Sequence, residues 1–127
     1  MKFGYTIIYV NDVEATLAFY QQAFGLEIGF FHESKQYGEL KTGNTTLAFA
    51  SEALSESNGV TFVKNNKENL AAGFEVALIT ENVDDAYKNA CAAGAIAVKD
   101  PVEKPWGQRV AYVRDLNGIL IEIASPM

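Results

Sequence analysis

The feature that most restricts the fold of this sequence is an internal repeat. In the first half, "YTIIYV" (Tyr5–Val10) is rich in β-branched and aromatic residues and predicts a strand. The stretch after it, "NDVEATLAFYQQAFG", changes to a helical period, with Asn11 or Asp12 as the N-cap and Gly25 just past the last turn. Three more short strands are predicted from "LEIGFFHES", "QYGELKT" and "TTLAFAS". The first half is therefore expected to be a strand, a helix and three strands.

The second half repeats this order. "EVALIT" (Glu75–Thr80) predicts a strand, "ENVDDAYKNACAAG" predicts a helix, and "AIAVKD", "QRVAYVRD" and "GILIEIAS" predict three strands. Tyr5 and Glu75 hold the same place in the two first strands, and "TLAFAS" aligns with "LIEIAS" so that Ala48 corresponds to Glu122. A repeat of this length indicates two copies of one supersecondary unit.

Polar stretches mark the limits of the two copies. The copies span about residues 1–63 and 73–127, and we expect them to form one domain over residues 1–127. Residues 64–72, "KNNKENLAA", are polar and break the periodicity, which predicts a connector. Residues 51–59, "SEALSESNG", are predicted to form a surface loop.

Charge and cysteine content restrict the partners and the compartment. The chain has 10 Lys and Arg against 16 Asp and Glu, a formal net charge of -6 that argues against a nucleic-acid partner. Cys91 is the single cysteine, so no internal disulfide can form, and a reducing cytoplasm is expected. No apolar run approaches the roughly 20 residues that cross a bilayer, and no signal peptide is expected. We therefore expect a soluble cytoplasmic protein with no membrane partner.

The duplicated units, together with "NDVEATLAFYQQAFGLE" and "PWGQRVAYVRDLNGILIEIAS", resemble the vicinal oxygen chelate superfamily. That superfamily contains glyoxalase I, extradiol dioxygenases, fosfomycin-modifying enzymes and bleomycin resistance proteins. The resemblance implies an α+β fold in which two βαβββ modules form a cupped mixed sheet. Because one fold hosts many functions, it says less about activity than about architecture.

The resemblance also implies where a metal would be bound. In related enzymes four inward positions carry His and carboxylate ligands, and here these positions fall on Tyr5, Ala48, Glu75 and Glu122. Only Glu122 matches a usual ligand type, and Ala48 has no donor atom. Two carboxylates suit zinc, nickel or iron poorly, and Mg²⁺ or Mn²⁺ held with several waters is the remaining alternative. We expect no cofactor and no metal centre, and the sequence identifies no catalytic residue.

The carboxylate of Glu122 interrupts an apolar strand. Side chains alternate along a strand, so Ile119, Ile121 and Ile123 share one face, which is expected to pack beneath a helix. Glu122 then lies on the opposite face with Leu120. That face is either solvated or, as the resemblance implies, the concave side that holds a ligand.

Several aromatic and apolar residues complete the predicted ligand site. Trp106 lies between Pro105 and Gly107, a context that favours an exposed loop. Phe30 and Phe31 are expected in the core, His32 at the surface or a strand end, and Cys91 as an inert packed thiol. The predicted ligand-binding residues are Tyr5, Ile7, Tyr9, Ala48, Glu75, Trp106, Tyr112 and Glu122.

Two functions are compatible with this pattern. The first is a metal-free binding protein that resembles bleomycin resistance proteins and sequesters a cationic or aromatic compound. The second is a glyoxalase-like lyase or dioxygenase that uses a divalent metal at a reduced site, or Glu75 or Glu122 as a general base. A homodimer is expected in either case, because it would cover exposed sheet edges. The sequence leaves open whether the sheet closes within one chain or across the dimer.

Overall fold

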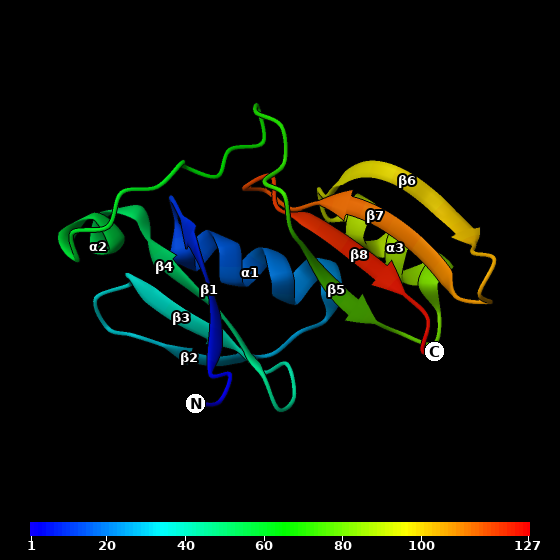
Figure 1. Cartoon of the computed structure of the whole chain (residues 1–127), viewed down its shortest axis with the longest axis horizontal. Coiled ribbons are helices and arrows are strands. Elements are labelled where there is room, and N and C mark those ends of the chain that lie inside the picture. Colours follow the sequence, from blue (N-terminus) through cyan, green and yellow to red (C-terminus); the bar gives the residue numbers. More distant parts are fainter. The chain divides into compact units, whose positions relative to one another are not determined.

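The computed structural model describes residues 1–127, which divide into two compact units, Met1–Lys64 and Asn65–Met127. We describe each unit by itself and call them unit 1 and unit 2. Both contain a strand, a helix and three further strands in chain order (Figure 1). The predicted α+β class and the two βαβββ modules are therefore confirmed.

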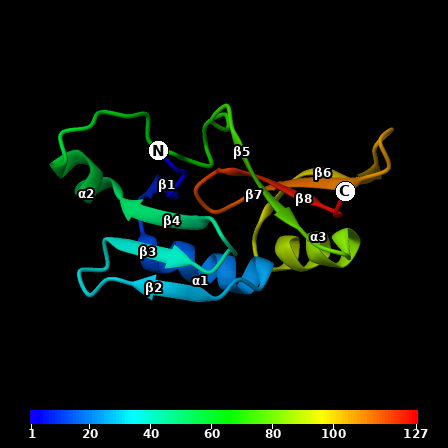
Figure 2. The same ribbon diagram turned by 60° about the horizontal axis from the view of Figure 1, so that its bottom comes forward.

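Unit 1 is a four-stranded mixed sheet with helix α1 against one face (Figures 1 and 2). The strand order is β1-β4-β3-β2, with β1 parallel to β4 and the other neighbours antiparallel. Its elements are β1 (Tyr5–Val10), α1 (Val13–Phe24), β2 (Ile28–Phe31), β3 (Tyr37–Leu40), β4 (Thr46–Ser51) and the short helix α2 (Glu52–Ser57).

Unit 2 repeats this arrangement. The strand order is β5-β8-β7-β6, β5 runs parallel to β8, and helix α3 packs against β6, β7 and β8 (Figure 2). Its elements are β5 (Glu75–Ile79), α3 (Val83–Ala92), β6 (Ile96–Glu103), β7 (Arg109–Arg114) and β8 (Leu120–Ala124).

Helix α1 begins and ends where its sequence predicts. The side chain of Asp12 accepts a hydrogen bond from the Ala15 amide at 3.0 Å, so Asp12 and not Asn11 is the N-cap. Gly25 adopts φ 68°, the left-handed conformation that glycine tolerates best, and its amide bonds the Gln21 carbonyl. Between these ends the helix buries one apolar side against the sheet.

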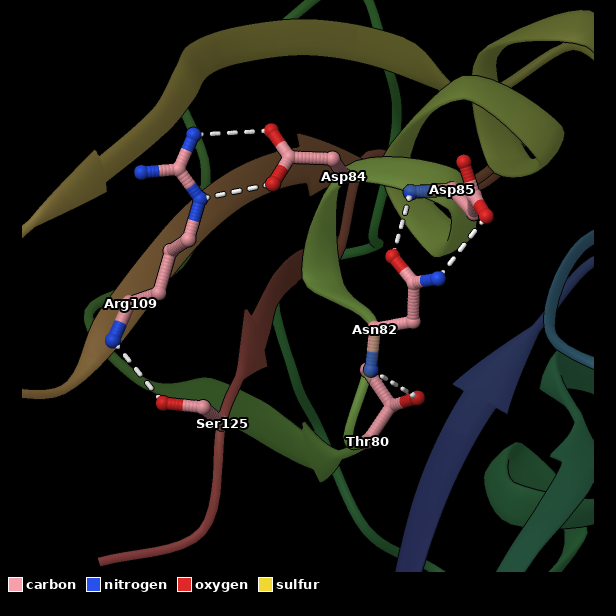
Figure 3. Close-up of polar contacts among 6 residues, drawn as sticks. All are labelled: Thr80, Asn82, Asp84, Asp85, Arg109 and Ser125. Carbon is pink, nitrogen blue, oxygen red and sulfur yellow. Dashed lines mark hydrogen bonds and ion pairs between the residues drawn. The ribbon is translucent and has the colours of Figure 1, made fainter.

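Helix α3 is held to its sheet by an ion pair near its N-terminus (Figure 3). Asn82 is the N-cap and accepts from the Asp85 amide. Arg109 of β7 donates two hydrogen bonds to Asp84, from Nε at 2.7 Å and Nη2 at 2.8 Å (Figure 3). The hydrogen bond to Arg109 holds the pKa of Asp84 below its ordinary value. This contact joins the first turn of the helix to β7.

The core of unit 2 confirms the expected alternation along the last strand. Ile119, Ile121 and Ile123 are all buried, whereas Leu120 and Glu122 are half-buried. Because α3 contacts β8, the isoleucine side of the strand is the one that faces the helix.

Two expectations were wrong. Residues 52–57, predicted as part of a loop, form α2, because Ser51 caps the helix by accepting from the Leu54 amide at 3.0 Å. Phe30, expected in the core, is 47% exposed. It lies on β2, an edge strand of unit 1, opposite Glu39 in the register, so one of its sides faces no other strand.

The connector between the units contains no helix or strand from residue 58 to residue 74. Its second part is tied to unit 2 by Arg114, which donates from Nη2 to the Asn69 carbonyl at 2.7 Å and from Nε to the Gly118 carbonyl at 2.8 Å. Gly118 is required at this point, because a Cβ there would lie 2.5 Å from Arg114 Nη2 and 2.8 Å from the Asn66 carbonyl oxygen. None of the helices is both long and apolar enough to cross a membrane.

Candidate functional site

Each sheet has one face against its helix, and we call the opposite side its open face. On the open face of unit 2, the register places Glu122 of β8 between Tyr112 of β7 and Ala77 of β5. Glu75 lies two residues before Ala77 on β5, so it shares the same side of the sheet. Alternation along three neighbouring strands thus brings two carboxylates and a phenol together.

Hydrogen bonds join these three side chains. The Tyr112 hydroxyl donates to Glu122 Oε2 at 3.0 Å, and the carboxyl groups of Glu75 and Glu122 are close enough to form a hydrogen bond when one of them is protonated. We call Glu75 and Glu122 the carboxylate pair. A hydrogen bond between two carboxyl groups requires a proton on one of them, so the pair is arranged to share a proton.

The surroundings of the carboxylate pair alter its acid–base properties. Partial burial, followed by the hydrogen bond and the negative charge of Glu122, raises the pKa of Glu75 above its ordinary value. Burial and the same Glu122 carboxylate raise the pKa of Tyr112 to about 12. Tyr112 therefore remains a protonated donor at neutral pH, and Glu75 holds its proton longer than an isolated glutamate.

No cation of the chain neutralises the carboxylate pair. The ion pairs of the molecule involve other acids, such as Asp84 with Arg109, and none includes Glu75 or Glu122. Arg114 lies in the same cross-strand row as Glu75, but its guanidinium is bonded to backbone carbonyls. Lys99, opposite Tyr112 in the register, is exposed and forms no ion pair. The negative charge of the carboxylate pair therefore has no partner in the chain and is available to a cationic ligand.

Four of the predicted ligand-binding residues lie on the open face of unit 1. Tyr5, Ile7 and Tyr9 alternate with buried residues along β1, and Ile7 is paired with Ala48 of β4. Tyr5 and Ile7 are 59% and 44% exposed, so their rings and methyl groups are accessible. Tyr9 is half-buried and packs edge-on against Phe62, with ring centroids 4.7 Å apart.

Trp106 lies apart from the carboxylate pair of its own unit. It is in the turn between β6 and β7, 62% exposed, and its indole N–H donates to Gln108 Oε1 at 2.9 Å. Tyr112 is six residues further along the chain, a distance of roughly 20 Å along an extended strand. The predicted loop position is observed, and unit 2 does not bring Trp106 to the carboxylates.

His32 and Cys91 also lie outside the carboxylate pair. His32 is exposed, and its Nδ1 interacts with Ser34 Oγ at 2.8 Å. Cys91 is a free, half-buried thiol on α3, on the helix side of the sheet. Within unit 2, Cys91 therefore adds no sulfur donor to the pair.

The residues present do not fit the metal that the sequence resemblance implies. Around Glu122 the donors are carboxylate and phenol oxygens, whereas zinc, nickel and iron sites in proteins rely on imidazole or thiolate. No group of three or more His, Cys, Asp or Glu side chains is arranged to hold a metal ion. Ala48, another of the four implied positions, has no donor atom.

One polar pair was missed from the sequence. On the open face of unit 1 the Tyr37 hydroxyl donates to Glu39 Oε2 at 2.7 Å, and Glu39 is paired with Ala48. Burial and Glu39 raise the pKa of Tyr37 well above its ordinary range, so this phenol also stays protonated. The signal was present in "QYGELKT", where Tyr37 and Glu39 alternate with Gly38 and Leu40, both of which are buried.

Comparison with known proteins gives consistent results. The family model described as Glyoxalase/Bleomycin resistance protein/Dioxygenase superfamily matches residues 2–123. The uncharacterized protein YraH of Bacillus subtilis (strain 168) is 29% identical over 128 residues, covering 97% of both chains. A glyoxalase-related enzyme from Fulvimarina pelagi has a TM-score of 0.83 at 22% identity, over 99% of this chain and 88% of that chain. TioX from Micromonospora sp. ML1 has a TM-score of 0.74 at 22% identity, over 100% of both chains. At these identities the solved structures show the fold.

Proposed function

The chain belongs to the glyoxalase/bleomycin resistance protein/dioxygenase superfamily, and on that premise we propose that it is a metal-free small-molecule binding protein that sequesters a cationic, aromatic compound. The observation that carries the proposal is the carboxylate pair, Glu75 and Glu122, which is bonded by Tyr112 and neutralised by no cation of the chain. Its place on the open face of unit 2 supports a role in binding.

A cation with hydrogen-bond donors suits this pair for a physical reason. Two carboxylates in contact repel each other unless they retain a proton, and a bound cation removes that repulsion while it supplies donors to both groups. The excess of acidic residues in the chain adds a negative field that attracts cations. Tyr112, whose hydroxyl is bonded to Glu122, would supply aromatic surface beside the pair.

The ligand class can be tested with three compounds of one shape. Benzamidine is a cation with paired N–H donors, benzamide is its neutral counterpart and benzoate is an anion. We expect benzamidine to raise the melting temperature of the protein in a concentration-dependent manner, and the other two to have much smaller effects. Stabilisation by benzoate or by thiol conjugates alone would contradict the proposal.

The alternative function is enzymatic, as a glyoxalase-like lyase or dioxygenase with a divalent metal at a reduced site. The observation that favours catalysis is the raised pKa of Glu75, since a carboxylate whose pKa lies closer to neutrality is a stronger general base. Turnover of an anionic or thiol-conjugate substrate that is lost in Glu75→Gln would favour this alternative.

The metal content separates the two functions directly. We expect no stoichiometric zinc, nickel or iron in protein purified without added metal, because imidazole and thiolate donors are lacking around Glu122. Inductively coupled plasma mass spectrometry would measure this. About one tightly held ion per chain would contradict the binding-protein proposal and support the enzyme.

We further propose a cytoplasmic homodimer without nucleic-acid or membrane partners. Within their own units β1 and β5 are edge strands, each paired with a single neighbour, and Tyr5, Ile7 and Ile79 on them are exposed. Covering such edges and apolar side chains with a second copy is favourable. Sedimentation velocity at micromolar concentration is expected to show a dimer, and a monomer alone would contradict the proposal.

A further inference from the structure

One row of side chains crosses the centre of each open face. In unit 1 the register aligns Phe30, Glu39, Ala48 and Ile7 on β2, β3, β4 and β1. In unit 2 it aligns Lys99, Tyr112, Glu122 and Ala77 on β6, β7, β8 and β5. Each row contains one carboxylate, but the two carboxylates lie on different strands and have different neighbours. The two open faces therefore offer different chemistry.

Aromatic rings surround the carboxylate of unit 1. Glu39 is half-buried, accepts from Tyr37 at 2.7 Å and lies directly opposite Phe30, which is 47% exposed. The ring centroids of Phe30 and Tyr37 are 6.4 Å apart. Tyr5 is close enough to Tyr37 to contribute to the upward shift of its pKa. A negative charge thus lies beside two rings.

The strand next to Glu39 is covered on this face. Ala48, paired with Glu39, and Ala50, paired with Tyr37, present only methyl groups, and both are buried. On the far side of β4 these alanines face Ile7 and Tyr9. Because both alanines are buried, other side chains already cover this strand, and the accessible surface beside Glu39 lies on the side of β2, where Phe30 is 47% exposed.

No charge in the chain compensates Glu39. It takes part in none of the ion pairs, and the nearest lysine along β3, Lys41, is paired with Glu27. His32, the other titratable group at this end of the sheet, is exposed, and its Nδ1 interacts with Ser34. A ligand is thus the available source of positive charge for this carboxylate.

We infer that unit 1 carries a second binding site, centred on Glu39, that recognises a quaternary ammonium group. Such a group has no N–H donors, so it gains most from aromatic faces and from a nearby negative charge. Phe30 and Tyr37 supply the faces, and Tyr37 already satisfies one oxygen of Glu39. The carboxylate pair of unit 2 differs, because its two adjacent carboxyl groups favour a cation that donates hydrogen bonds.

The test uses the full chain and calorimetric titration with benzyltrimethylammonium, with benzyl alcohol as a smaller neutral compound that keeps the benzyl ring. Glu39→Gln is expected to raise the dissociation constant by about tenfold or more, and Phe30→Leu by several fold. Gln keeps an acceptor for Tyr37, and Phe30 is exposed, so both variants should fold. Circular dichroism melting curves check this. Glu33→Gln, which removes an exposed charge from the same unit, is the matched control and should leave binding unchanged.

Three outcomes would overturn the inference. These are no measurable binding of benzyltrimethylammonium to the wild-type protein, equal binding by wild type and Glu39→Gln, or a loss confined to Glu122→Gln. The last result would assign the quaternary cation to unit 2, so the proposed function would stand while this inference failed. The converse result is that every variant binds benzamidine as well as the wild type does while Glu39→Gln still weakens benzyltrimethylammonium binding. That result would contradict the proposed function and leave this inference standing.

Discussion

Glu122→Gln is expected to weaken benzamidine binding by about 1 to 3 kcal/mol, the range for losing one charge-assisted hydrogen bond. Glu122 has the central place in the cluster, because it is bonded to both Glu75 and Tyr112. Glu75→Gln should have a similar effect. Both changes preserve the shape of the side chain and remove a charge from a repelling pair. The melting temperature of each variant should therefore equal that of the wild type or be slightly higher. Isothermal titration calorimetry measures the affinities, and thermal melting measures the stability.

Two control variants test whether the weaker benzamidine binding comes from the carboxylate pair itself. Glu81→Gln removes an exposed negative charge from the same unit without touching the pair, and should leave the affinity almost unchanged. Tyr112→Phe removes the phenol donor but keeps both carboxylates, so its effect should be smaller than that of Glu122→Gln. Equal affinities in wild type, Glu75→Gln and Glu122→Gln would show that the carboxylate pair does not contact the ligand.

Benzamidine binding is expected to fall by about tenfold or more when the pH is lowered from about 8 to about 4.5. Benzamidine stays protonated over this range, whereas the raised pKa of Glu75 means that, as the pH falls, the pair gains a proton before isolated glutamates do. Tyr112, whose pKa is raised to about 12, keeps its proton throughout this range. Calorimetric titration across this range measures the fall. A flat profile would exclude titration of the pair in binding.

The same protonation should appear in the stability of the free protein. Because the pKa of Glu75 is higher in the folded chain than in the unfolded one, the folded state binds more protons between the two values. The free energy of unfolding therefore loses this contribution as the pH rises through the folded pKa. The Glu75→Gln variant lacks this pH-dependent contribution at every pH. The melting temperature of the variant minus that of the wild type should therefore increase as the pH rises. A constant difference at all pH values would contradict the shared proton.

Local patterns were sufficient to predict most of the fold. Period-two and helical periodicity placed the strands and the two long helices, and the caps at Asp12 and Gly25 marked the limits of α1. The alternation around Glu122 separated the buried isoleucine face from the open face. These features depend on neighbours along the chain. The helix α2 was missed because Ser, Glu and Asn in residues 51–58 suit both loops and helix caps.

The two residues that form the carboxylate pair could be predicted from the sequence, but their contacts could not. The repeat placed Glu75 and Glu122 at equivalent positions to Tyr5 and Ala48, and alternation gave their face of the sheet. Their mutual hydrogen bond and that of Tyr112 needed strand order and register, which bring residues far apart in the sequence onto adjacent strands. No local pattern contains that information.

The amino-acid order was thus enough to establish the repeat, the α+β class and the side of each strand that faces a helix, because these follow from periodicity over a few residues. Cross-strand neighbours came from the folded structure alone. It placed Glu39 beside Phe30 and Tyr37, left Phe30 exposed on an edge strand, and put Trp106 in a turn away from Glu122. The physical reason is that register and strand order are set by packing of the whole sheet against its helix, a property that no single segment carries.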